Sequence, residues 1–424
     1  MKLMETTTTR RLPLIFLSLL LFSFLITACS ESEPESHLAI SNEISTEIIY
    51  EGARLIVGNG NVIENASFSV ENGQFIAVGP TATMTFPVDA KRVDLSSMTV
   101  IPAIIDTHVH LSTSRDALIE DLKKRASQGI AAAQSLGSDG QGAPLDVRNE
   151  IISGAARYLS AGRGITSPEP GRSEVPHWVT SIEEARQSVR DEVARNVDII
   201  KIWVDDRDGQ YERLSPELYG AVIDEAHKNN LQVAAHIFRL EDAKGLLEAG
   251  VDIFAHGIRD KDIDDEFVAM VIARPNVVLI PNLPYRGIPT ELGWLSESMS
   301  MTEAEELQGI NIERPEVQEA FGIQARNLAR LSQSGMLIAM GTDGNSFWGP
   351  HIEMEDMVAS GMTPAEVIVA ATKNSAELLG FNDLGTVEVG KSADFVVLAE
   401  NPLDDIVNTR RIVNVYLRGE EVPR

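Results

Sequence analysis

The sequence contains almost no cysteine and is short of positive charge. Cys29 is the only cysteine among 424 residues, so an intramolecular disulfide is excluded and no thiolate is available for a metal site or a nucleophile. Lysine and arginine number 36 against 63 aspartates and glutamates, which gives a formal net charge of −27. A surface with this charge repels nucleic acids and anionic lipid headgroups. We therefore expect a small-molecule substrate and no nucleic acid partner, and any metal ion must bind to histidine, carboxylate or lysine side chains.

Residues 1–28 are typical of a signal peptide. Basic residues precede an apolar run at 12–26, which is shorter than the roughly 20 residues needed to span a membrane. The run ends in Ile-Thr-Ala-Cys, which resembles the lipobox of bacterial lipoproteins, where the cysteine becomes the lipidated first residue. The resemblance implies an exported protein that is anchored by Cys29 to a bacterial membrane, the outer membrane on its periplasmic side, and that contacts the membrane only through this anchor. Ordinary signal cleavage after Ala28 is the alternative.

The remaining chain divides into a tether and two kinds of folded segment. Residues 29–46 are polar and cannot bury enough apolar surface to fold, so we expect a disordered tether. Residues 47–98 and 383–424 contain short alternating strands separated by turn residues. Neither segment is large enough to bury a core alone, so we expect the two chain ends to form one small β-sandwich. Between them, residues 99–382 alternate apolar strands with amphipathic helical segments, which is typical of an α/β fold.

Eight candidate strands in this central segment predict a TIM-type (β/α)8 barrel. The third candidate is the weakest, because the residues that follow it are rich in glycine and proline. In such a barrel the carboxyl ends of all strands open on one face, where catalytic residues collect. The candidates are 99–106, 129–136, 161–166, 197–204, 231–237, 251–256, 276–282 and 335–342.

Polar residues with metal-binding side chains stand at the ends of several of these strands. His108 and His110 end the first barrel strand, and because they are two residues apart both imidazoles point the same way and can share one ion. His236, His256 and Asp343 each terminate a further apolar run. A buried structural histidine would explain any one of these positions. Four independent strand-end placements favour a common metal site.

These motifs resemble those of the amidohydrolase superfamily, in its imidazolonepropionase-like and prolidase-like branch. The likeness covers nearly everything from Ile48 onward, and it implies a metal-dependent hydrolase that binds one or two divalent ions, with zinc as the expected metal. The motifs are Ile-Asp-Thr-His-Val-His at 105–110, Val-Ala-Ala-His at 233–236, Ala-His-Gly at 255–257, Gly-Thr-Asp at 341–343 and Leu-Gly-Thr-Val-Glu-Val-Gly-Lys-Ser-Ala-Asp at 384–394. The metal ligands that the resemblance implies are His108, His110, Lys201, His236, His256 and Asp343.

The role of Lys201 determines whether the predicted site binds one metal ion or two. It lies inside an apolar strand, where its charge is costly unless it is removed or paired. In binuclear members of the family the equivalent lysine is carboxylated by carbon dioxide and the carbamate bridges both ions, so the resemblance implies two ions with Lys201 as the bridge. A lysine that extends to the surface is the alternative. The one-ion deaminase branch has a glutamate three residues after the strand-five histidine, whereas this chain has Arg239 there, which disfavours deamination.

The resemblance implies hydrolysis of an amide or peptide-like C–N bond by a metal-bridging hydroxide, with a dipeptide or an N-acyl amino acid as the first candidate substrate. Asp343 is then the catalytic residue, which accepts a proton from water and passes it to the departing amine; a role as ligand only is the alternative. Hydrolysis of a lactone, ester or phosphotriester at the same site is a second reading. A non-catalytic lipoprotein that binds a ligand in its barrel is a third.

Four residues near the expected barrel mouth are candidates for substrate binding. Asp205 follows Lys201, Tyr285 and Arg286 follow the seventh strand, and His351 lies beyond Asp343. We expect Arg286 to pair with a substrate carboxylate, and a solvated loop arginine is the alternative. The sequence does not determine the oligomeric state, and a homo-oligomer is compatible with it.

Overall fold

The computed structural model describes residues 46–140 and 142–424. The expected signal peptide, the lipidation site Cys29 and all of the expected tether except Thr46 lie outside the described residues. Within these ranges no helix is both long enough and apolar enough to cross a membrane.

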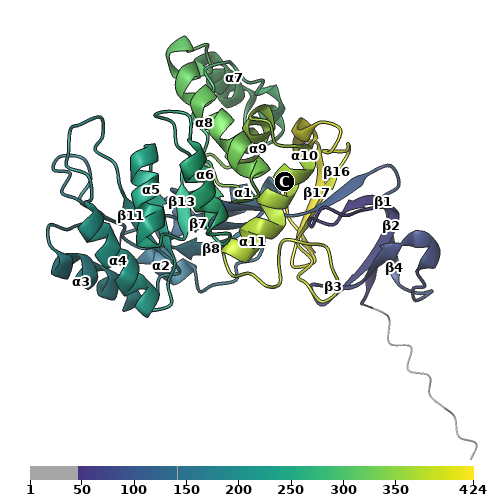
Figure 1. Cartoon of the computed structure of the whole chain (residues 1–424). Helices are drawn as coiled ribbons and strands as arrows, with labels where there is room; N and C mark the ends of the chain where they lie inside the picture. The colour runs from purple at the N-terminus through teal and green to yellow at the C-terminus, as the bar shows by residue number, and fades with distance from the viewer. Residues whose placement is uncertain (1–45, 141) are drawn as a thin grey trace, which may run out of the picture. The chain divides into compact units, whose positions relative to one another are not determined.

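An eight-stranded sheet combines strands from both ends of the chain, coloured purple and yellow in Figure 1. Its order is β18-β17-β16-β5-β1-β2-β3, and β4 pairs with β1. The two ends meet at β5, which is parallel to β1 and antiparallel to β16. The strands are β1 (Ile48–Ile56), β2 (Val62–Glu71), β3 (Gln74–Pro80), β4 (Lys91–Asp94), β5 (Thr99–Pro102), β16 (Phe395–Leu398), β17 (Ile412–Leu417) and β18 (Glu420–Glu421).

Aromatic side chains from both ends form the core of this sheet. Tyr50 of β1 stacks on Phe68 of β2 with a centroid separation of 4.9 Å, and Phe395 of β16 stacks on Tyr416 of β17 at 4.5 Å. Tyr50 also meets Phe395 edge to face at 5.2 Å. Because each aromatic ring buries a large apolar area, the two chain ends stabilise each other in a way that neither could achieve alone.

The central part of the chain has the topology of a TIM-type barrel. β6, β7 and β8 form one parallel sheet, and β9 to β15 form a second, with β10 at its edge. Backbone hydrogen bonds continue across both junctions, from Asp198 N to Ser160 O (3.0 Å) and from Thr107 N to Met340 O (3.0 Å). The strands are β6 (Ile104–Val109), β7 (Ile130–Ser135), β8 (Arg157–Ser160), β9 (Ile165–Thr166), β10 (His177–Trp178), β11 (Ile200–Trp203), β12 (Val233–His236), β13 (Ile253–Ala255), β14 (Val278–Ile280) and β15 (Leu337–Ile338).

Helices alternate with the barrel strands (Figure 1). In α4 the buried residues recur at helical spacing, as at Tyr219, Val222, Ile223 and Ala226, so one face packs on the barrel. Ser215 caps the start of this helix, and its side chain accepts a hydrogen bond from the backbone N–H of Leu218. The helices are α1 (Arg115–Ser127), α2 (Ala143–Val147), α3 (Ile182–Val193), α4 (Pro216–Lys228), α5 (Leu240–Ala249), α6 (Asp265–Ile272), α7 (Met301–Ile310), α8 (Pro315–Gln333), α9 (Gly349–Ala359), α10 (Pro364–Val369) and α11 (Ser375–Leu378), with 3-10 turns at Thr81–Thr83, Gly293–Glu297 and Ile406–Arg410 and a π-helical turn at Ala370–Asn374.

The first predicted barrel strand, 99–106, is two strands that belong to different sheets. Thr99–Pro102 pairs with the strands of the chain ends, whereas Ile104–Val109 pairs with β7. Ala103 N donates to Asp394 O on one side, and Ile104 N donates to Gly129 O on the other. The chain therefore enters the barrel at Ile104 rather than at residue 99.

The third predicted strand, 161–166, is also divided. The structure has β8 before it and β9 at its end, with two glycines between them. A Cβ on Gly164 would lie 1.9 Å from the ring of Trp203. The indole of Trp203 on β11 thus occupies the space beside Gly164, so no larger residue fits at this point of the strand.

Candidate functional site

Four polar side chains meet at the carboxyl ends of β6, β13 and β15. Asp343 Oδ1 lies 3.0 Å from His108 Nε2 and 2.9 Å from His110 Nε2. Asp343 Oδ2 lies 3.5 Å from His256 Nε2. Ligand-type atoms of His108, His256 and Asp343 all lie within 4.8 Å of one another. This spacing matches side chains that bind a common ion.

Unusual backbone conformations turn two of these side chains towards the others. His256 has a φ of +85° and Asp343 a φ of +56°, which non-glycine residues rarely adopt. The backbone N–H of His256 still donates to Ile280 O (2.9 Å), and that of Asp343 donates to His108 O (2.7 Å). Strand hydrogen bonding therefore extends to both residues and holds them in a strained conformation, which is typical of functional sites.

His236 and Lys201 extend the cluster across β12 and β11. The ring of His236 lies 4.4 Å from that of His256. Lys201 is fully buried, and within the described part of the chain its Nζ has no hydrogen-bond partner. Burial lowers the pKa of Lys201 to about 7, although the charge of Asp343 opposes this shift. A substantial fraction of this amine is therefore uncharged at neutral pH.

Three histidines of the cluster, His108, His236 and His256, are neutral at pH 7. Burial, followed by the charge of Lys201, lowers the pKa of His108 to about 4. Burial also lowers the pKa of His236 and of His256 well below the ordinary value. Burial alone would raise the pKa of Asp343, but the contacts with His108 and His256 lower it far below its usual range. Neutral imidazoles around a carboxylate are the protonation states in which these residues bind metal ions.

Two further residues orient the cluster, and sequence reasoning missed both. Asn282 Oδ1 lies 2.9 Å from Nδ1 of His108, an arrangement that places the proton on Nδ1 and directs the Nε2 lone pair into the site. Arg125 Nη1 lies 2.8 Å from Asp106 Oδ2, and both side chains are fully buried. Asp106 also accepts hydrogen bonds from Thr342 N (3.0 Å) and Thr342 Oγ1 (2.9 Å). This ion pair therefore joins the strand of His108 to the loop of Asp343.

Asp205 lies beside the cluster, and its role in substrate binding stays a prediction. Its Oδ2 is 3.3 Å from His236 Nε2 and 2.6 Å from Arg207 Nη1. Arg207 also contacts Glu169 Oε1 through Nε at 3.1 Å. Sequence reasoning did not identify Arg207 or Glu169, because only the fold brings their two loops together.

The other three predicted substrate-binding residues are engaged with the protein itself. Arg286 pairs with Glu355 (2.5 Å) and Asp356 (2.9 Å) of α9, so its charge is already compensated. Tyr285 donates its hydroxyl proton to Asn311 Oδ1 (2.9 Å). His351 is buried, and its two ring nitrogens lie 3.1 Å from Thr409 Oγ1 and 3.1 Å from Gln128 O. The roles of Arg286 and His351 in substrate binding therefore stay predictions, and Tyr285 lines a cavity of about 250 Å³.

Comparison with known proteins identifies the family. The pattern of the amidohydrolase family matches residues 99–422. The chain belongs to the amidohydrolase family. This amidohydrolase is 25% identical over 387 residues to the imidazolonepropionase of Geobacillus thermodenitrificans, an alignment that covers 79% of the chain and 84% of the relative. It is 23% identical over 433 residues to the ochratoxinase of Aspergillus niger, covering 87% of the chain and 84% of that relative.

Solved structures agree with this assignment. The structure of a candidate prolidase from Bifidobacterium longum superposes with a TM-score of 0.74 at 27% identity, covering 89% of this chain and 95% of that one. The predicted family and the predicted TIM-type fold are thereby confirmed, and the protein is a hydrolase. Divalent metal binding is general in this family, and the cluster of histidines and Asp343 is suited to it.

Proposed function

We propose that this amidohydrolase cleaves the C–N bond of a dipeptide or an N-acyl amino acid with the help of two divalent metal ions. The observation that supports it best is the convergence of neutral imidazoles, a carboxylate and an unpaired buried amine at the carboxyl ends of the barrel strands. Active sites of TIM-type barrels lie at this face.

The side chains at this face fit divalent ions. Nε2 of His108 and Nε2 of His256 are buried and form no hydrogen bond with any described residue, although Asp343 is near both. Nitrogen and oxygen donors of this kind suit zinc, manganese or cobalt. When bound, two such ions would lower the pKa of a water molecule and polarise the carbonyl group of the substrate. The residues that would hold them are His108, His110, Lys201, His236, His256 and Asp343.

Lys201 supports a site for two ions rather than one. A permanently charged ammonium group would be costly here, because within the described residues no carboxylate forms a hydrogen bond with its Nζ. Its neutral amine can attack carbon dioxide, forming an N–C bond and releasing one proton. The product is a carbamate, so that a neutral amine becomes an anionic group whose two oxygens would be available to hold divalent ions.

We infer that Asp343 transfers the proton. Its side chain is 35% exposed and that of His110 is 31% exposed, whereas His108 and Lys201 are buried, so water reaches the cluster on the Asp343 side. Asp343 accepts a proton as the oxygen of water bonds to the substrate carbonyl carbon. It then donates this proton to the nitrogen that departs when the C–N bond breaks.

The substrate class is supported by the relatives and by general chemistry. The Bifidobacterium longum structure is named for prolidase activity, and the Aspergillus niger relative is named ochratoxinase. A buried cluster that activates water and polarises a carbonyl is suited to amide bonds, which water attacks slowly on its own. We therefore place dipeptides and N-acyl amino acids first among the compounds to be tested.

Metal analysis together with an activity panel tests the proposed function. Protein reconstituted with zinc and ¹³C-bicarbonate should contain two zinc ions per chain, show a carbamate carbon signal by NMR, and hydrolyse members of a panel of dipeptides and N-acyl amino acids. Lys201→Ala should lose the carbamate signal and the activity. Asp343→Asn should lose activity.

Lys228→Ala is the matched lysine control, because Lys228 is an exposed residue of α4 that pairs with Asp224. It should retain both zinc ions and the activity of the unchanged protein. One zinc ion per chain or fewer would refute the two-ion site, and a Lys201→Ala protein that still binds two would refute the role of Lys201 in holding them. Hydrolysis of lactones or esters alone would refute the substrate class.

We also propose that the protein is exported and held at the membrane through lipidated Cys29. The support is the apolar run at 12–26 and the Ile-Thr-Ala-Cys sequence that follows it. Mass spectrometry of the mature N-terminus should find a diacylated Cys29, and Cys29→Ser should release the protein from membranes. An unmodified N-terminus at this position would argue for ordinary cleavage.

A further inference from the structure

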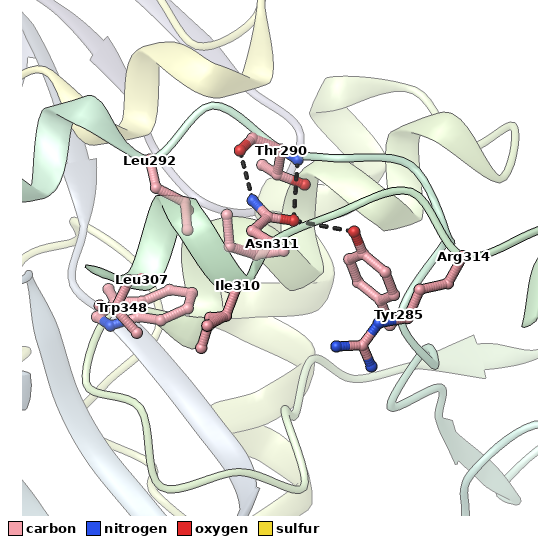
Figure 2. A pocket seen from close by; sticks show the side chains of 9 residues that line it. Tyr285, Thr290, Leu292, Leu307, Ile310, Asn311, Arg314 and Trp348 are labelled. Atoms are coloured by element: carbon pink, nitrogen blue, oxygen red, sulfur yellow. Dashed lines mark hydrogen bonds between the residues drawn. The ribbon is translucent and has the colours of Figure 1, made fainter. Parts of the chain in front are cut away.

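A cavity of about 250 Å³ lies among the loops that follow β14 and β15 (Figure 2). Most of its wall is apolar. Leu292, Leu307, Ile310 and Trp348 contribute side chains, and α7 supplies two of them. Pockets that hold a whole small ligand measure roughly 300–1,000 Å³, so this cavity fits a single ring or a branched aliphatic chain.

The cavity is close along the chain to the proposed metal ligands. Tyr285 in its wall lies three residues after Asn282, whose side chain contacts His108. Trp348 lies five residues after Asp343. Extended chains of three and five residues span at most about 11 and 18 Å. The cavity therefore belongs to the mouth formed by the loops at the carboxyl ends of the barrel strands, where barrel enzymes bind substrates.

Hydrogen bonds within the wall hold the cavity in shape. Asn311 Oδ1 accepts from the Tyr285 hydroxyl (2.9 Å) and from Thr290 N (3.3 Å), and Asn311 Nδ2 donates to Thr290 O (2.6 Å), as Figure 2 shows. These contacts occupy the polar groups of Asn311 and the hydroxyl of Tyr285. The wall is therefore preformed, and what it offers a ligand is mainly apolar surface.

Arg314 is the exception in this wall. Its guanidinium group lies 5.6 Å from the ring centre of Tyr285. Among the residues that the structure describes, none forms a side-chain hydrogen bond or an ion pair with it, in contrast to Arg286, which is paired twice. In Figure 2 the group extends beside Tyr285 on the side of Ile310. An unpaired guanidinium favours a carboxylate, which it can bind through two parallel hydrogen bonds.

We propose that this cavity is a substrate subsite that binds one apolar group, an aromatic ring or a branched aliphatic chain, with a neighbouring carboxylate paired to Arg314. The assignment rests on the proposed function, because the occupant is part of the molecule that is hydrolysed. It transfers carboxylate recognition from Arg286, where the sequence predicted it, to Arg314. The scissile amide of the same substrate would then extend towards Asp343.

Binding of 4-phenylbutyrate and of its uncharged amide, 4-phenylbutyramide, tests the subsite directly. Calorimetry on the zinc-loaded protein should show the acid binding more tightly, by up to about fivefold, because Arg314 is exposed. Arg314→Gln should remove this preference and leave the binding of the amide unchanged. Leu307→Trp should fill the cavity and weaken the binding of both compounds.

Arg326→Gln is the matched control, because Arg326 is a 61% exposed arginine of α8, the helix that starts directly after Arg314. It changes the net charge equally and should retain the preference for the acid. Equal affinities of the acid and the amide for the unchanged protein would overturn the role of Arg314. Undiminished binding of both compounds by a folded Leu307→Trp protein would overturn the assignment of the cavity.

Inhibition kinetics separate a failure of the subsite from a failure of the proposed function. 4-Phenylbutyrate should compete with an N-acyl amino acid substrate, and Arg314→Gln should raise KM for that substrate at unchanged kcat. Non-competitive inhibition of a protein that does hydrolyse the panel would overturn the subsite alone. Arg314-dependent binding of 4-phenylbutyrate by a protein that hydrolyses no member of the panel would overturn the proposed function, and the substrate role of the cavity with it.

Discussion

Replacing Arg125 with methionine tests whether the buried ion pair beneath the histidines holds the metal centre together. Arg125 Nη1 lies 2.8 Å from Asp106 Oδ2, and neither side chain is exposed. Methionine keeps most of the apolar stem but leaves Asp106 without its cation. Removal of one partner from a buried ion pair costs about 3–5 kcal/mol, because the remaining charge stays buried and uncompensated.

The contacts of Arg125 and Asp106 narrow the expected loss of unfolding free energy. Asp106 keeps its hydrogen bonds from Thr342 N and Thr342 Oγ1, which favours the lower end. The variant also loses the hydrogen bond from Arg125 Nη2 to Gly344 O (3.2 Å), which contributes about 1 kcal/mol. We therefore expect a loss of about 4 kcal/mol. For roughly 380 folded residues the unfolding entropy is about 0.8 kcal/mol per kelvin, so Tm should fall by about 5 °C.

Urea unfolding and calorimetry of the metal-free protein provide the assay. Arg115→Met is the control, because Arg115 lies on the same helix but forms an exposed ion pair with Glu150, worth about 0–1 kcal/mol. Adding Asp106→Asn to Arg125→Met removes the orphaned charge, so the double variant should lose less than the sum of the single losses. A loss below about 1 kcal/mol for Arg125→Met, or strict additivity in the double variant, would refute the reasoning.

Three other predictions concern His351, Gly341 and Arg286. Burial lowers the pKa of His351 to about 3, so below pH 6.5 the unfolded state takes up a proton that the native state does not. The free energy of unfolding should therefore fall by up to about 1.4 kcal/mol per pH unit. His351→Gln should make this pH dependence less steep, as measured by urea unfolding at pH 7 and pH 5. Gly341→Ala should lower the zinc content, because its Cβ would lie 2.9 Å from His108 N, whereas a Cβ on Gly344 meets nothing closer than 3.7 Å. Arg286→Met should reduce the unfolding free energy and leave KM unchanged, because Arg286 already has two carboxylate partners.

Each of these has a result that contradicts it. Parallel pH profiles for the unchanged protein and His351→Gln would show that the buried imidazole carries no proton linkage. Equal zinc content in Gly341→Ala and Gly344→Ala would show that the strand of His108 tolerates the added methyl group. A raised KM for a carboxylate substrate in Arg286→Met would restore that arginine as a substrate contact.

The candidate ligands could be predicted because their signal is local. His236, His256 and Asp343 each end an apolar run, and the geometry of a parallel barrel brings such ends together. The split at Ala103 has no local signal, because residues on both sides of it are apolar and buried. Only the partners distinguish the two strands, and one of those partners, β16, begins at Phe395.

Most of the residues that sequence reasoning missed are charged residues whose partners lie far away in the sequence. Arg125 falls at helical spacing on the buried stripe of Leu118 and Leu122, so its burial was visible in principle but its partner was not. Arg286 follows a strand end as a substrate-binding residue would, yet Glu355 neutralises it from a helix 69 positions away. Whether a charge is compensated depends on which residues the fold brings together, so the partner of a charged residue cannot be identified from its own segment of sequence.

The sheet built from both chain ends has a consequence for the order in which the protein can mature. Strand β5 pairs with β1 along one edge and with β16 along the other. All residues between Pro102 and Phe395 must be synthesised before β16 can cover the second edge. Until then the growing chain carries an open strand edge and an uncovered aromatic face, both of which invite association with other chains. The last strands therefore complete the sheet. A chain whose synthesis stopped before Phe395 would be a target for proteases, even though it contained every metal ligand.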